Sequence, residues 1–212
     1  MKRVTFVFGH YGSGKSEFCI NVGIKTNIDY LVDLDIINPY FRSREVFEIL
    51  KNNNIEVISS SVKDSIGSDL PYISKDIFLP IMNKSKVIYD LGGEVGAKLL
   101  RQFSGLNLDD YEMLLVCNIY REETSSVKSI IDTINRIESY SGVKITGLVN
   151  NTNLIRETTS NDVIYGQNIL EEVSKILNIK IKYTCLSKHL KKQDEYLGEV
   201  IIMNGYLRKE WM

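Results

Sequence analysis

The sequence predicts an α/β fold in which a mostly parallel, twisted sheet is covered by helices on both faces. Two observations carry this prediction: short apolar runs alternate with helix-like segments along the chain, and a glycine-rich segment follows directly after the first run. The chain of 212 residues is long enough to bury a sizeable core, and no linker-like composition divides it. We therefore expect residues 1–212 to form a single domain of three layers.

Seven short apolar runs are the candidate strands of this sheet. They are Val4–Phe8, Tyr30–Leu34, Ile55–Ile58, Lys86–Tyr89, Glu112–Cys117, Lys144–Val149 and Ile179–Tyr183. Strands that alternate with helical segments are typical of βαβ units, whose strands run parallel.

Two of the intervening segments carry a clear helical pattern. Within residues 123–140, apolar side chains recur at three- and four-residue spacing, and residues 169–177 repeat the pattern. The serine-rich stretch from Ser59 to Pro71 reads as a long loop. The last stretch, 196–212, is moderately apolar and is expected to pack against the body of the domain.

Composition excludes several classes of protein. A formal net charge of -1 gives no bulk-charge signal for a nucleic-acid or anionic-membrane partner. No uncharged apolar run approaches the length of a membrane span, and no basic-then-apolar leader precedes the first run, so we expect a cytoplasmic protein. Cys19, Cys117 and Cys185 are far apart and odd in number, which predicts buried thiols rather than disulfides or a cysteine metal site.

The glycine-rich segment Gly9-His10-Tyr11-Gly12-Ser13-Gly14-Lys15-Ser16 has the pattern of a phosphate-binding P-loop. Glycines let consecutive backbone N–H groups turn inward around phosphate oxygens, and the following helix adds its positive dipole end. Lys15 would reach the β- and γ-phosphates, and Ser16 would offer its hydroxyl to Mg²⁺. The candidate nucleotide-binding residues here are Gly9, Gly12, Ser13, Gly14, Lys15 and Ser16. The motif predicts a P-loop NTPase fold.

Acidic residues end two of the candidate strands. Asp35 is expected to position an attacking water or to contact the metal, with Asp33 as a structural partner. Asp90 resembles a carboxylate that holds Mg²⁺ through water, and Gly93 would turn a backbone N–H towards the γ-phosphate. The alternatives are that Asp90 caps a turn and that Asp35 forms an Asx turn.

Two further features lie near the predicted site. Arg42 and Arg44 would meet a phosphate or a substrate carboxylate, or would belong to a surface salt-bridge face. Asn150 and Asn151 follow a candidate strand where many GTPases carry Asn-Lys-x-Asp, but neither the Lys nor the Asp is present. Because an amide both donates and accepts hydrogen bonds, it suits the edge of adenine. ATP is therefore preferred, with Asn150 as the first candidate contact and Asn151 as the second.

Together these segments resemble the MinD/ParA/CobQ-type P-loop ATPases. The matching pieces are residues 9–16, 32–35, 90–93 and 147–151, and residues 33–45 are also similar to a poorly characterised clostridial-type group of ATP-binding proteins. The resemblance implies nucleotide at the interface of a homodimer. His10 and Tyr11 replace the early lysine that many members carry, and Glu17 replaces a second hydroxyl residue.

The sequence thus favours a Mg²⁺-dependent ATPase that acts as a nucleotide switch or accessory factor for a partner protein. Lys15 and Asp35 are the expected catalytic residues, and Ser16, Asp35 and Asp90 are the expected Mg²⁺ ligands. Two alternatives remain open: a small-molecule kinase, and a nucleotide-dependent binding module without significant turnover.

Overall fold

The computed structural model describes residues 1–35, 44–59, 75–103 and 111–207. In chain order, the strands and α-helices are β1 (Val4–Gly9), α1 (Lys15–Thr26), β2 (Tyr30–Leu34), α2 (Arg44–Asn52), β3 (Glu56–Ser59), α3 (Leu79–Met82), β4 (Val87–Gly92), α4 (Gly93–Leu99), β5 (Tyr111–Cys117), α5 (Val127–Ser141), β6 (Gly147–Asn150), α6 (Ser160–Leu177), β7 (Ile181–Ser187) and β8 (Glu199–Met203). Arg42 and most of the predicted loop between Ser59 and Pro71 lie outside the described residues.

All the strands belong to one eight-stranded sheet in the order β3-β2-β4-β1-β5-β6-β7-β8. Every neighbouring pair runs parallel, which confirms the predicted α/β architecture. β1 lies between β4 and β5, and the chain crosses β4 to reach β2. The carboxyl end of β1 therefore lies where strand order reverses, which is where open parallel sheets bind ligands.

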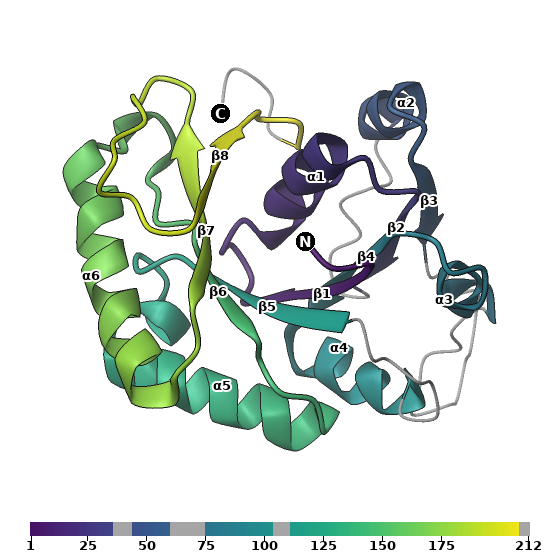
Figure 1. The fold of residues 1–212 in the computed structure, drawn as a ribbon, viewed down its shortest axis with the longest axis horizontal. Helices are drawn as coiled ribbons and strands as arrows, with labels where there is room; N and C mark the ends of the chain where they lie inside the picture. The colour runs from purple at the N-terminus through teal and green to yellow at the C-terminus, as the bar shows by residue number, and fades with distance from the viewer. Residues whose placement is uncertain (36–43, 60–74, 104–110, 208–212) are drawn as a thin grey trace.

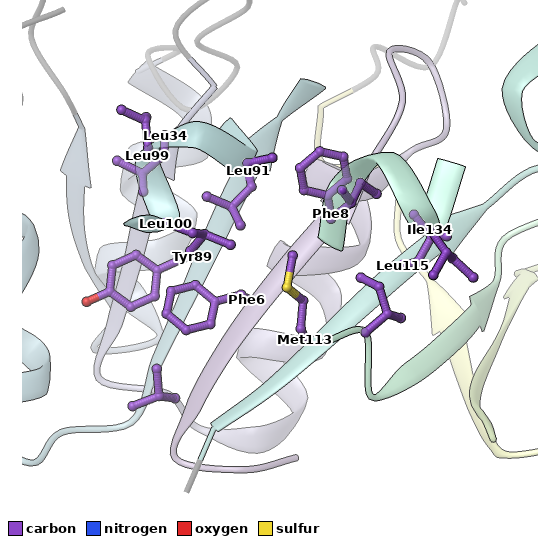
Figure 2. Packing of buried hydrophobic residues seen from close by; sticks show 14 of the residues in the cluster. Phe6, Phe8, Leu34, Tyr89, Leu91, Leu99, Leu100, Met113, Leu115 and Ile134 are labelled. Atoms are coloured by element: carbon purple, nitrogen blue, oxygen red, sulfur yellow. The ribbon is translucent and has the colours of Figure 1, made fainter. Parts of the chain in front are cut away.

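Helices cover both faces of the sheet, so each face has its own hydrophobic core (Figure 1). Successive side chains along a strand point alternately into the two cores. Phe6, Tyr89 and Met113 point into the core shared with α4, α5 and α6 (Figure 2). Val7 and Ile88, one position along, point to the opposite face, where α1 and α2 pack. Both faces of the central strands are buried, so these strands read as continuous apolar runs.

Capping side chains and a glycine set the ends of the long helices. Ser126 and Thr159 cap α5 and α6 through reciprocal hydrogen bonds with the residue three positions on. Gly142 caps the carboxyl end of α5 with a φ of 73°, a conformation that suits glycine. The apolar face predicted within residues 123–140 is confirmed by the buried side chains of Ile130, Ile134 and Ile137 on α5.

Two further sequence expectations can be compared with the structure. Cys19, Cys117 and Cys185 are all buried free thiols, as predicted. Among the helices that the structure describes, none has both the length and the apolar character needed to cross a bilayer.

Candidate functional site

The glycine-rich loop connects the central strand β1 to the start of α1. Gly12 and Gly14 have φ values of 76° and 82°, which L side chains rarely adopt. A Cβ on Gly14 would lie 2.3 Å from Asn151 Nδ2, so this position also needs glycine for space. No side chain caps the first turn of α1, so its N–H groups are available to an anion.

Lys15 lies at the centre of a buried charge cluster. Its Nζ is 2.6 Å from Asp35 Oδ2 and 3.7 Å from Asp90 Oδ1, and it is 4% exposed. Ser16 donates its hydroxyl proton to Asp90 Oδ2. Burial alone would lower the pKa of Lys15, but the charges of Asp90 and Asp35 outweigh it and raise the pKa above its ordinary value. The structure therefore brings together Lys15, Ser16, Asp35 and Asp90.

Asp33 lies beside this cluster, directly across from Asp90 in the β2–β4 pairing. Its Oδ1 accepts the backbone N–H of Asp35 at 3.0 Å, which supports the structural role expected for it. Burial, followed by repulsion from Asp90, raises the pKa of Asp33 to about 7. Burial likewise raises the pKa of Asp90, against the lowering effects of Lys15 and Ser16.

The cluster also fits a hydrated Mg²⁺. Three buried side-chain atoms of described residues have no hydrogen-bond partner here: Ser13 Oγ, Asp33 Oδ2 and Asp90 Oδ1. Hydroxyl and carboxylate oxygens are the donors that Mg²⁺ prefers. Within the described residues, no group of three or more His, Cys, Asp or Glu side chains is placed to hold a metal ion. A Mg²⁺ held here would therefore need phosphate and water ligands in addition to Ser16 and Asp90.

The two asparagines after β6 have different surroundings. Asn150 is fully buried, donates to the carbonyl of Val163 at 3.0 Å and accepts the N–H of Thr152 at 3.2 Å. This differs from the expectation that Asn150 is the first base contact, because its amide supports the loop from inside the core. Asn151 instead donates to the carbonyl of Ser13 at 2.6 Å and so ties the β6 loop to the glycine-rich loop.

A cavity of about 380 Å³ opens beside Gly14 and Asn151. It is lined by the carboxyl ends of β7 and β8, by the segments that follow β6, β7 and β8, and by the start of α1. The lining residues are Gly14, Glu17, Asn151, Asn153, Ile155, Arg156, Cys185, Ser187, Lys188, His189, Met203, Asn204 and Gly205. Its volume lies within the range of small-molecule sites. The cavity adjoins the loop on one side, as a nucleoside pocket next to a phosphate site would.

A second, smaller cavity of about 250 Å³ lies on the other side of the loop. Its lining includes His10 and Gly93, apolar side chains such as Ala97 of α4 and Ile137 of α5, and the charged side chains of Glu123 and Arg136. Gly93 is the first residue of α4 and has a φ of 52°. Arg44 is the first residue of α2.

Sequence reasoning missed several residues that hold the loop in place. Arg121, after β5, donates from Nε to the carbonyl of Gly12 at 3.1 Å, and His10 Nε2 lies 2.9 Å from Glu123 Oε1. A Cβ on Gly92 would lie 2.3 Å from Asp35 Oδ1, so glycine there lets Asp35 approach β4. The pair of glycines after Asp90 was the available signal for this close approach.

Comparisons with known proteins give structural likeness alone. No protein-family model matches the chain, and no curated protein matches it in sequence. Among solved structures, the cell division protein FtsY from Thermotoga maritima has a TM-score of 0.51 at 16% identity, covering 86% of this chain and 61% of its own.

Two nucleotide complexes are similar as well. A nucleotide-binding protein from Archaeoglobus fulgidus, in complex with ADP, has a TM-score of 0.52 at 12% identity over 96% of this chain and 83% of its own. FtsY from Elizabethkingia anophelis, in complex with GDP, has a TM-score of 0.52 at 15% identity, covering 87% of this chain and 57% of its own.

The chain spans about three fifths of the length of the first FtsY structures that it matches. At these identities the likeness concerns the fold. Together with the parallel sheet and the loop geometry, it shows that this chain has the α/β fold of the P-loop NTPases.

Proposed function

We propose that this protein binds ATP with Mg²⁺ and hydrolyses it as a nucleotide switch or accessory factor for a partner protein. The observation that carries the proposal is the buried cluster of Lys15, Ser16, Asp35 and Asp90 at the uncapped start of α1. A cation, a hydroxyl and two carboxylates beside free helix N–H groups are the parts that phosphoryl transfer to water requires.

Each residue has a role that its position supports. Phosphate oxygens would compete with Asp35 for the Lys15 ammonium, and the released Asp35 carboxylate would orient the attacking water. Ser16 and Asp90 would hold the Mg²⁺, which supplies charge neutralisation at the transferring phosphate. Gly93 follows β4 and lines the smaller cavity, and its N–H would meet the γ-phosphate.

The cavity beside Asn151 supports ATP over GTP. Among the described residues that line it, Glu17 is the one carboxylate, and both of its oxygens accept backbone N–H groups. The Glu17 carboxylate is thus engaged by the chain's own N–H groups rather than held open for the N1–H and amino group of guanine, whereas asparagine amides suit adenine. Of the two similar complexes, the one with ADP is also the one that this chain covers more fully.

We place the protein among MinD/ParA-type ATPases as part of the same proposal. The support is the Asp33-x-Asp35 segment, whose second carboxylate reaches Lys15. Loss of the γ-phosphate would be felt at Asp35 itself, because phosphate oxygens and Asp35 compete for the Lys15 ammonium. Signalling to a partner would follow from such a change.

The experiment measures phosphate release and nucleotide affinity with ATP and GTP, each with and without Mg²⁺. We expect ATP preference, Mg²⁺ dependence, and near-complete loss of both activities in Lys15→Ala. The matched control is Lys25→Ala, because Lys25 is an exposed lysine in the last turn of the same helix. Equal affinity for GTP would refute the adenine assignment, and binding by Lys15→Ala as tight as wild type would refute the site.

The smaller cavity favours one second candidate, a small-molecule kinase. His10 and Gly93, next to the expected γ-phosphate, belong to its lining, and so do the polar side chains of Glu123, Thr133 and Arg136. An acceptor seated there would take the phosphoryl group in place of water. Steady ADP formation by the purified protein without any added acceptor would exclude this candidate.

A further inference from the structure

The four residues after β8 form a C-terminal strap, residues 204–207, that is bound to the first two turns of α1. Glu17, which directly follows Ser16, accepts the N–H of Tyr206 at 2.6 Å through Oε1 and that of Leu207 at 3.0 Å through Oε2. One turn further along α1, Asn21 completes the attachment. It donates to the carbonyl of Asn204 at 2.9 Å and accepts the N–H of the same residue at 2.7 Å.

This attachment is buried and polar, which makes it specific. Glu17 and Asn21 are 9% and 4% exposed, so their hydrogen bonds are largely shielded from water. Tyr206 and Leu207 also pack against the core on the α1 face of the sheet. Figure 1 shows the chain leaving β8 and turning towards α1.

The strap also lines the larger cavity. Asn204 and Gly205 form one side of it, and Gly14 and Asn151 belong to the side that meets the glycine-rich loop. Glu17 contributes to both the cavity and the strap, because it lines the cavity and accepts a hydrogen bond from the strap. The cavity therefore keeps this wall only while the strap stays bound to α1.

We propose that the C-terminal strap is a wall of the nucleoside pocket, and that Glu17 is the positioning residue that fixes it there. This inference rests on the proposed function, since it assigns the nucleoside part of ATP to the cavity. Affinity for the nucleoside then depends on a contact between α1 and the end of the chain. The triphosphate, held by the loop and Lys15, does not depend on that contact.

The test compares ATP, ADP and inorganic tripolyphosphate as ligands of the full chain. For Glu17→Ala we expect ATP and ADP affinity to fall about tenfold or more, because two charge-assisted hydrogen bonds to the strap are lost. Tripolyphosphate affinity should be no weaker, since the change also removes a negative charge near the phosphates. Hydrogen exchange at the Tyr206 and Leu207 amides should become faster.

Glu17→Gln separates the strap contact from the charge. Both variants remove the carboxylate charge, but glutamine keeps an oxygen that can accept one N–H, so we expect a smaller loss of ATP affinity than in Glu17→Ala. Glu172→Ala, at an exposed position of α6, is the control and should match wild type.

Three results would overturn the inference. They are unchanged ATP affinity in Glu17→Ala, an equal loss for ATP and tripolyphosphate, and identical behaviour of the alanine and glutamine variants. Wild type decides the proposed function separately: failure of the wild-type chain to bind ATP refutes that function, whereas wild-type binding with an unaffected Glu17→Ala refutes the strap alone.

Discussion

Replacing Lys15 with alanine should destabilise the protein even when no nucleotide is added. Lys15 is 4% exposed, and its partners Asp35 and Asp90 are 7% and 0% exposed, so the substitution leaves two buried carboxylates without their cation. Removing one partner of a buried ion pair costs about 3–5 kcal/mol. That is a large part of the roughly 5–15 kcal/mol that stabilises an ordinary domain.

The assay is urea denaturation of the ligand-free protein at pH 8 and at pH 5. We expect Lys15→Ala to lose more stability at pH 8 than at pH 5, because burial raises the pKa of Asp90 and the substitution removes the Lys15 charge that lowers it. Lys15→Ala combined with Asp35→Asn should recover part of the loss, and Lys25→Ala should stay within about 1 kcal/mol of wild type. An unfolding midpoint for Lys15→Ala equal to wild type at pH 8 would refute the reasoning.

Three other predictions follow from the same contacts. The raised pKa of Asp33, about 7 against an ordinary 3.8, means that its contribution to stability is present below about pH 4 and is lost as the pH rises through about 7. Asp33→Asn should flatten the free energy of unfolding between these values, and an unchanged slope would contradict the assignment. Asn150→Ala should lower the free energy of unfolding by about 1–3 kcal/mol, because two buried partners lose their hydrogen bonds. Asn151→Ala should mainly weaken ATP binding, as measured by calorimetry. The opposite pattern would restore Asn150 as the base contact. Asp90→Asn should raise the Mg²⁺ concentration needed for half-maximal phosphate release, and an unshifted Mg²⁺ titration would remove Asp90 from the metal site.

The sheet and the phosphate-type loop could be predicted because their signals are local. A buried parallel strand is an apolar run whatever it packs against, and the glycines of the loop mark positive φ at Gly12 and Gly14. The last strand, β8, was missed. Its sequence does contain an apolar run, Val200 to Met203, but this run lies in the stretch 196–212, whose moderately apolar composition predicts only that it packs against the domain.

The assignment of the two asparagines needed information that the sequence does not carry. Successive residues at a strand end point to opposite sides, so a dipeptide offers one side chain to the core and one to the site. Which of the two asparagines faces the core depends on the register of the strand. The predicted strand, Lys144 to Val149, differs from the observed β6, Gly147–Asn150. Asn150 is the last residue of that strand, and its amide faces Val163 on α6.

The attachment of the strap could not be foreseen for a different reason. Glu17 and Tyr206 are separated by 189 positions, and a single sequence contains no measure of their distance in space. Glu17 was noted as a departure from the usual hydroxyl residue, and the structure gives that departure a physical purpose. Arg121 and Glu123 are similar cases, since each reaches the glycine-rich loop from the segment that follows β5.

The ties between the glycine-rich loop and the segment after β5 have a mechanical consequence. Glu123 contacts His10 through its side chain, and its carbonyl accepts the hydroxyl of Thr133 on α5 at 3.0 Å. His10, in the glycine-rich loop, is thereby linked to Thr133, in the middle of α5, by a side-chain contact and a hydrogen bond that both involve Glu123. A displacement of His10 would therefore be transmitted through Glu123 to Thr133, in the middle of α5.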